Sequence, residues 1–324
     1  MVTRRLTLAP PPLSGLSDQL RVRMAPGSFT DDGLTMRYAL SDNAAIDAAV
    51  DDSRSIWAVN IHGFFAGGGM YWRESARLAG GLGWKVVNPS LPSFGGSQPL
   101  EWSDLSMSAF AARLAALLDH LEVERAVVLG HSMGGAVAMQ FAHDHPDRCL
   151  GVIYRDGAGP SSWKTRHGLL TKITEPISPD VGSMVEIVAG AVADIPDLAW
   201  GRLGSFVRGV LPDARRNIHS LADTFPVAAM LFYENLDPVI LAVSSTDIPI
   251  LPMWGRSDRL VPRGTALDFS DIVGEPVVWI AGGHSWMLPR PVTQLRTLQR
   301  HPQGQDFVRR VAARDADLAA ASAA

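Results

Sequence analysis

The sequence predicts an α/β protein with a mostly parallel central sheet that is flanked by helices and interrupted by a helical insertion. Short apolar runs bounded by turn residues alternate with stretches whose apolar residues recur at helical spacing. This alternation is typical of parallel sheets whose strands are buried on both faces. It stops near residue 160 and resumes near residue 246. We therefore expect a core domain over 19–159 and 246–324, a helical cap over 160–245 and a flexible arm over 1–18.

The expected elements follow in order along the chain. Alternating residues over 20–24, a turn at 31–33 and a strand over 34–40 predict a paired sheet edge, and the acidic, Ala-rich segment 41–54 predicts a loop. A helix is expected over 106–121, where apolar residues recur at helical spacing. The remaining strands are expected over 56–61, 85–87, 126–129, 150–154, 248–254 and 276–280. The carboxy-terminal part looks helical and is expected to end in a frayed Ala-rich tail.

The composition excludes several classes of protein. The 324 residues are 47% hydrophobic and 19% charged, which is too apolar for a disordered chain and enough for a large core. A net charge of −4 gives no general attraction to nucleic acid or to an anionic membrane. Cys149 is the only cysteine, so no intrachain disulfide and no zinc cluster is expected. No apolar run is long enough for a signal peptide or a membrane span, so a cytoplasmic protein is expected.

The strongest local signal is the turn Gly130-His131-Ser132-Met133-Gly134, which Gly135 follows. An apolar strand precedes it and a helical pattern follows it. A serine on such a strand-to-helix turn takes a strained backbone conformation that lifts its hydroxyl clear of the sheet. The glycines relieve crowding, and the helix directs its positive end at developing negative charge. The turn therefore predicts that Ser132 is a nucleophile.

From about residue 20 to about residue 300 the chain resembles the α/β-hydrolase family. The resemblance depends on segments that occur in the family's order, namely HGF at 62–64, LPSFGGS at 91–97, GHSMGG at 130–135, GRSD at 255–258 and GGHS at 282–285. It implies an α/β-hydrolase fold and a cofactor-independent serine hydrolase with a small-molecule acyl substrate. It does not point to any one member of the family.

The resemblance also implies that His284, after the last expected strand, is the general base. We expect Asp258, in the turn GRSD after the strand over 248–254, to orient its imidazole. Serine, acid and histidine then occur in the order 132, 258, 284, which is the order that this fold uses. Asp156, which follows the strand over 150–154, remains open as the alternative acid.

Two backbone N–H groups are expected to stabilise the oxyanion of the reaction. One belongs to Met133, the residue after the nucleophile. The HGF segment resembles the family's second donor loop and assigns Phe64, with Phe65 as the alternative. The glycine run 67–69 departs from simpler relatives and is expected to widen the pocket or to make it mobile. It does not predict a nucleotide site, because Trp72 stands where G-x-G-x-x-G needs its last glycine.

The segment 160–245 resembles the helical cap that many relatives place over the active site. A cap favours a medium-sized, largely apolar substrate, with Phe65, Trp163 and Trp286 as candidate pocket side chains. A carboxylic ester is the expected substrate. The same groups could cleave an amide, a thioester or a carbon–carbon bond. A second hypothesis, from another class of protein, remains open: the chain is a ligand receptor or an interaction protein that turns over slowly.

Overall fold

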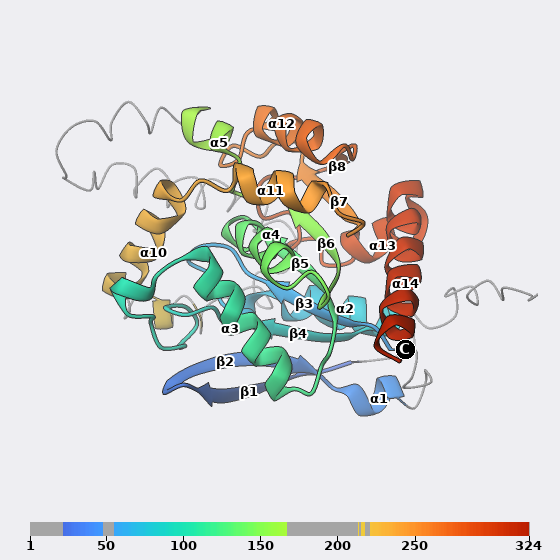
Figure 1. Ribbon diagram of the computed structural model, residues 1–324, viewed down its shortest axis with the longest axis horizontal. Coiled ribbons are helices and arrows are strands. Elements are labelled where there is room, and N and C mark those ends of the chain that lie inside the picture. The colour runs from blue at the N-terminus through green and yellow to red at the C-terminus, as the bar shows by residue number, and fades with distance from the viewer. Residues whose placement is uncertain (1–21, 48–54, 167–212, 214, 218–220, 324) are drawn as a thin grey trace, which may run out of the picture.

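The computed structural model describes residues 22–47, 55–166, 213, 215–217 and 221–323 (Figure 1). The expected arm over 1–18 and much of the expected cap lie outside the described residues. The described residues of the segment expected as a cap include the helices α5 (Ser161–Arg166), α10 (Leu221–Tyr233) and α11 (Asp237–Ser244), and residues 213 and 215–217 are also helical.

Eight strands of the described residues form one mostly parallel sheet. They are β1 (Met24–Asp31), β2 (Leu34–Ser41), β3 (Trp57–Ile61), β4 (Lys85–Pro89), β5 (Ala126–His131), β6 (Cys149–Arg155), β7 (Ile250–Gly255) and β8 (Val278–Ile280). Their order is β1-β2-β4-β3-β5-β6-β7-β8. β1 and β2 pair antiparallel at one edge, β2 pairs antiparallel with β4, and the other neighbours run parallel. The predicted fold class is confirmed.

The other described helices connect these strands and cover the sheet. They are α1 (Asn43–Asp47), η2 (Gly68–Tyr71), α2 (Trp72–Leu82), η3 (Trp102–Asp104), α3 (Met107–His120), α4 (Met133–Asp144), α12 (Arg263–Val273), α13 (Thr293–Arg300) and α14 (Pro302–Ser322). α3 begins at an N-cap, because the Ser106 hydroxyl accepts a hydrogen bond from the N–H of Ala109 at 3.1 Å. α12 ends at Gly274, which is left-handed, as is common after a helix.

Three expectations about the chain were wrong. The strand expected over 20–24 begins only at Met24 and extends to Asp31. The segment expected as a loop over 41–54 contains the short helix α1, because Ile46 anchors it as a fully buried side chain. The expected frayed tail is helical through Ser322. Alanine favours helix there, and the Arg314 guanidinium ties α14 to the carbonyl oxygens of Cys149 and Pro146.

The apolar residues of each central strand alternate between two core clusters, one on each face of the sheet. Val128 and Val152 face the cluster that α3, α4, α11 and α12 cover, whereas Val127 and Ile153 face the cluster that α2, α13 and α14 cover (Figure 1). Because side chains alternate along a strand, an apolar run without polar interruption fills both layers. This packing holds the loops at the strand ends in fixed positions.

Among the described helices, none alone is both long and apolar enough to cross a bilayer. The segments Ala222–Tyr233 and Asp237–Ser244 pass such a test only when they are taken together, and they are bent by 67° relative to each other.

Candidate active site

The candidate site lies at the edge of the sheet where the parallel strands β3, β5, β6, β7 and β8 end. The loop after β3 carries His62 and Gly63, and β5 ends one residue before Ser132. Asp156, Asp258 and His284 follow β6, β7 and β8, respectively. Since the carboxyl ends of parallel strands meet at the same edge, residues far apart in the sequence come together there.

Ser132 sits on the sharp turn that the sequence predicts. Its backbone has φ 54° and ψ −121°, between the end of β5 and the first turn of α4. The turn is tight, because a Cβ on Gly130 would lie 2.2 Å from the carbonyl oxygen of Gly134. The N–H of Ser132 donates to the carbonyl of Arg155 at 3.0 Å, and its own carbonyl accepts from Gly135 at 2.9 Å. These contacts hold the strained serine in place.

His284 and Asp258 are joined by a hydrogen bond. The Nδ1 of His284 lies 2.9 Å from Oδ2 of Asp258, and both side chains are buried. The other carboxylate oxygen of Asp258 accepts from the backbone N–H groups of Leu260 at 2.8 Å and Val261 at 2.9 Å. The carboxylate is therefore held on the imidazole, which is the arrangement that fixes a histidine tautomer.

His131 connects His284 to the nucleophile turn. The two imidazole rings are 4.7 Å apart, and Nε2 of His131 lies 2.9 Å from the carbonyl oxygen of His284. Because a carbonyl only accepts, Nε2 of His131 carries the proton. Burial and the neighbouring His284 and Arg155 lower the pKa of His131 well below its ordinary value, so this ring is neutral. Ser132, the next residue, and His284 are thus held in the same cluster.

Asp156 is placed beside these groups but bonds differently. Its Oδ1 accepts from the N–H of Gly255 at 2.7 Å, and its Oδ2 accepts from the indole N–H of Trp286 at 2.6 Å. Burial and then the nearby Asp258 raise the pKa of the Asp156 carboxyl well above its ordinary value. Asp258 is therefore the carboxylate that bonds to the imidazole of His284. Asp156 bonds instead to the backbone of β7 and to the indole of Trp286.

Asp156, Asp258 and His284 are the described residues whose ligand atoms gather closely enough to suggest a metal, within 4.8 Å of one another. Both carboxylates already accept N–H hydrogen bonds on each of their oxygens. The three side chains therefore fit a hydrogen-bond network that positions the imidazole of His284.

The loop after β3 lies against the nucleophile turn. A Cβ on Gly63 would be 3.0 Å from the Cβ of Ser132, so a larger residue would be crowded against the nucleophile turn. Phe64 follows, with its ring edge-to-face against Phe65 at 4.6 Å. Met133 is the first residue of α4, and the first N–H groups of a helix have no partner within the helix. The two N–H groups expected to form the oxyanion hole therefore belong to segments on either side of Ser132.

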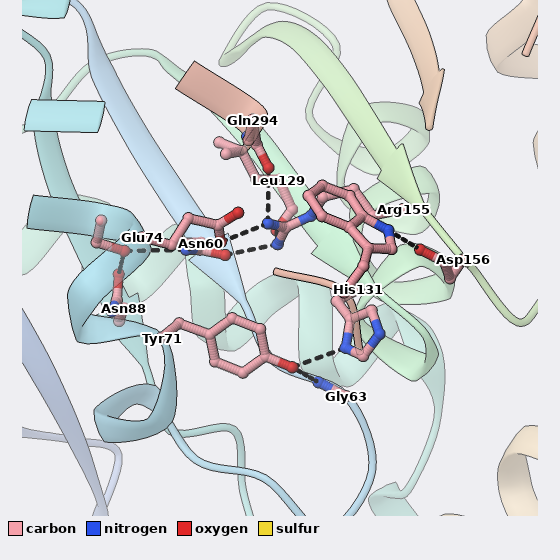
Figure 2. A network of polar contacts seen from close by, with 12 residues as sticks. Asn60, Gly63, Tyr71, Glu74, Asn88, Leu129, His131, Arg155, Asp156 and Gln294 are labelled. Carbon is pink, nitrogen blue, oxygen red and sulfur yellow. Dashed lines mark hydrogen bonds and ion pairs between the residues drawn. The ribbon is translucent and has the colours of Figure 1, made fainter. Parts of the chain in front are cut away.

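Tyr71 links this loop to the histidines (Figure 2). Its hydroxyl lies 2.7 Å from Nδ1 of His131 and accepts from the N–H of Gly63 at 3.4 Å. Since Nδ1 of the neutral His131 ring is an acceptor, the Tyr71 hydroxyl donates to it. One directed chain of hydrogen bonds thus runs from Gly63 through Tyr71 and His131 to the backbone of His284.

A buried ion pair lies beside that chain of hydrogen bonds (Figure 2). The Arg155 guanidinium is 2.7 Å from the Glu74 carboxylate, and their side chains are 0% and 2% exposed. Arg155 also donates to Oδ1 of Asn60 at 2.6 Å and to Oε1 of Gln294 at 2.9 Å. Its Cζ lies 6.0 Å from the ring centre of Tyr71. The network joins α2, β3, β6 and α13 under the site.

His62 supports the loop after β3, as expected. The fully buried ring donates from Nδ1 to the carbonyl of Gly63 at 2.8 Å, and Nε2 accepts from the N–H of Leu91 at 2.9 Å. Burial lowers the pKa of His62 to about 4, although the Gly63 hydrogen bond opposes this shift. The neutral ring is therefore required for both contacts.

The titration of His62 predicts a loss of stability in acid. An unfolded histidine binds a proton near pH 6.5, whereas folded His62 does so only near pH 4, so the unfolded chain takes the proton first. Stability is full above about pH 6.5 and falls by about 3 kcal/mol as the pH drops to about 4. Urea unfolding of the wild type and His62→Gln across this range measures the effect. We expect a flatter pH dependence in the variant; equal slopes would contradict the prediction.

The candidate pocket residues Trp286 and Trp163 are both buried among other side chains. Trp286 is 1% exposed within the core cluster that faces α13, and its indole holds Asp156. Trp163 is 7% exposed, donates from its indole N–H to the carbonyl of Leu260 at 2.9 Å and stacks on Phe232. Both side chains thus brace the acid-bearing segments of the site, and their contact with substrate remains a prediction.

Comparisons with known proteins identify the family of the chain. Residues 59–295 match the family model that describes the α/β-hydrolase fold. The chain belongs to the α/β-hydrolase family. The α/β-hydrolase relatives include a proposed non-heme haloperoxidase from Mycobacterium phage D29, which is 25% identical over 72% of this chain and 82% of its own length.

Another relative of this α/β-hydrolase is a 2-hydroxy-6-oxo-6-phenylhexa-2,4-dienoate hydrolase from Burkholderia cepacia. It is 26% identical over 63% of this chain and 72% of its own length. The fold is also similar to that of a thermophilic esterase from Thermogutta terrifontis, with a TM-score of 0.58 and 20% identity over 89% of this chain and 99% of that one. With named hydrolases among its relatives, this α/β-hydrolase is an enzyme, which disfavours the receptor hypothesis.

Sequence reasoning missed the polar side chains that support the site of this α/β-hydrolase. A signal was present for Arg155, which ends an otherwise apolar strand immediately before Asp156. Tyr71 and Glu74 carry no motif. Their importance arises from burial and from partners distant in sequence, such as His131 for Tyr71.

Proposed function

We propose that the protein is a serine hydrolase that cleaves a carboxylic ester through Ser132, His284 and Asp258. The observation that carries the proposal is the buried 2.9 Å hydrogen bond between His284 and Asp258, which His131 connects to the strained turn of Ser132. An oriented imidazole beside an activated serine is the arrangement that acyl transfer needs.

The reaction then follows from the roles of these groups. Oγ of Ser132 forms a bond to the carbonyl carbon and its proton passes to Nε2 of His284, while the carbonyl electron pair moves to oxygen. The N–H groups of Phe64 and Met133 stabilise that oxyanion. When the carbonyl re-forms, the bond to the leaving alcohol breaks and the alcohol takes the proton from His284. In the second half of the reaction, a water molecule gives a proton to His284 and attacks the carbonyl carbon of the acyl-serine. The bond to Ser132 then breaks, Oγ takes the proton back from His284, and the carboxylic acid product leaves.

We infer a medium-sized, largely apolar substrate from the surroundings of the nucleophile turn. Met133 belongs to the same apolar cluster as Trp163 and the cap residues Val227, Met230 and Ile240. Apolar walls with a few polar groups are typical of sites for apolar small molecules. Phe65 is half-buried, and its ring lies edge-to-face on Phe64, which packs against this cluster.

A second candidate is hydrolysis of a carbon–carbon bond on the same residues. The named relatives that cleave 2-hydroxy-6-oxodienoates favour it. The two candidates differ in substrate and not in the nucleophile. Turnover of a p-nitrophenyl ester series and of a 2-hydroxy-6-oxodienoate, measured in parallel, separates them: ester hydrolysis predicts the larger kcat/KM for an ester of intermediate chain length.

The nucleophile is tested with a fluorophosphonate probe, which reacts with activated serines. We expect one equivalent of label on the wild-type protein, and peptide mapping should place it on Ser132. The control Ser132→Ala should take up no label and hydrolyse no ester. Label on another residue, or unchanged ester turnover in Ser132→Ala, would contradict the mechanism.

A further inference from the structure

Asn217, a residue of the expected cap, is buried against the loop that carries Phe64. Its side-chain amide donates to the carbonyl oxygens of Phe65 at 2.7 Å and Ala66 at 3.0 Å. Its Oδ1 accepts from the N–H of Gly95 at 2.8 Å. With 2% of its surface exposed, Asn217 uses both amide hydrogens to hold one loop and its oxygen to hold a second.

Asp213 lies four residues earlier and packs on the same loop. The residue is 3% exposed, and its carboxylate faces the glycine run 67–69. A Cβ on Gly67 would lie 2.8 Å from Oδ2 of Asp213, and a Cβ on Gly69 would lie 2.7 Å from it. Gly67 and Gly69 of this run are therefore the places where a carboxylate packs against the loop backbone.

The Asp213 carboxyl is desolvated, and its pKa lies above the ordinary value. Burial raises the pKa of its carboxyl, whereas the Arg216 guanidinium and the N–H groups of Met70 and Gly69 lower it. The guanidinium NH1 of Arg216 lies 3.1 Å from Oδ1 of Asp213. Among the described residues, the Oδ2 of Asp213 that faces Gly67 and Gly69 is buried and has no hydrogen-bond partner. Asp213 therefore acts on this loop by packing and by its electrostatic field.

The held loop is strained next to the candidate oxyanion donor. Phe65 has φ 59°, a left-handed conformation that is uncommon for a bulky residue. Such a conformation persists only where the surroundings impose it. The Asn217 amide contacts the carbonyl of Phe65 itself, and the N–H of Phe64 is one residue away.

We propose that Asn217 and Asp213 are positioning residues that set the direction of the Phe64 N–H toward the reacting carbonyl. The inference depends on the proposed function, since it assigns these cap residues to the oxyanion hole of that mechanism. The cap then contributes to the rate through the donor loop, without contact between these two side chains and the substrate.

The variant Asn217→Asp tests the proposal. It has the same shape and keeps the oxygen that accepts from Gly95, but it replaces the donor to Phe65 and Ala66 with an acceptor. We expect kcat for an ester to fall about 10- to 100-fold, with KM within about twofold of the wild-type value. Affinity for a boronic acid inhibitor should fall by a similar factor, because its tetrahedral adduct places an oxygen in the oxyanion hole.

Asp213→Asn provides a second variant that removes only the charge. Its kcat and boronic acid affinity should fall about 3- to 10-fold, which keeps the proposal testable if Asn217→Asp does not fold. Glu234→Ala is the matched control. It removes a different contact between cap and core, to the N–H of Met107 at 3.0 Å, without touching the donor loop. We expect Glu234→Ala to lower the thermal denaturation midpoint and to leave kcat for the ester unchanged.

The outcomes separate this inference from the proposed function. If Asn217→Asp and Asp213→Asn lower the denaturation midpoint but keep wild-type kcat and boronic acid affinity, the two residues only attach the cap, and the positioning role is overturned. Wild-type protein that is not labelled by the fluorophosphonate at Ser132 would instead overturn the proposed function itself.

Discussion

Asp258→Asn is expected to lower kcat for an ester about 10⁴-fold without unfolding the protein. The N–H groups of Leu260 and Val261 hold one side-chain oxygen at Oδ1, so the amide NH2 of the variant must take the position of Oδ2 beside His284. There it donates to Nδ1 and moves the ring proton to Nε2. An imidazole that is protonated at Nε2 cannot accept the proton of Ser132.

Steady-state kinetics and circular dichroism of Asp258→Asn check this prediction. A loss smaller than about tenfold, in a variant with a wild-type spectrum, would contradict the orienting role of Asp258.

Asp156→Asn is the matched control because it makes the same change within the same buried cluster. The N–H groups of Gly255 and Trp286 both donate to Asp156, and an amide offers only one oxygen. One donor would therefore face the new NH2 group, and we expect a stability loss of about 1–3 kcal/mol. The kcat should change less than about tenfold, since the partner of His284 is kept. The reverse pattern would make Asp156 the orienting acid.

Arg155→Met is expected to destabilise the fold by about 3–5 kcal/mol. The substitution removes the cation from a fully buried pair and leaves the Glu74 carboxylate without a counter-ion. It also removes the donors to Asn60 and Gln294, so two buried amides lose a partner. An uncompensated buried charge is the dominant cost.

The double variant Arg155→Met with Glu74→Met shows whether charge is the cause. Removing both charges should recover at least half of the stability that the single variant loses, since an apolar pair needs no counter-ion. Urea unfolding of the two single variants, the double variant and the wild type gives the coupling free energy. Purely additive losses would assign the cost to packing and contradict this prediction.

The local motifs were visible to sequence reasoning because each depends on neighbours in the chain. Ser132 was recognisable from the strand, glycines and helix around it, and the structure has that turn with φ 54°. Asp258 was favoured over Asp156 from turn context, and the structure pairs His284 with Asp258. The glycine run 67–69 is recognisable in the sequence, but the Asp213 carboxylate that faces Gly67 and Gly69 is not, because it is more than 140 residues away in the chain.

What the sequence determined by itself is therefore the alternation of buried strands and helices, the family and the residues that carry local motifs. These features follow from the periodicity of side chains and from backbone conformations that only certain residues tolerate. The tertiary structure alone decided which carboxylate meets His284, how Tyr71 and His131 join two loops, and where Asn217 and Asp213 attach. Those pairings depend on desolvation and hydrogen-bond geometry between distant segments, and both arise only when the chain packs.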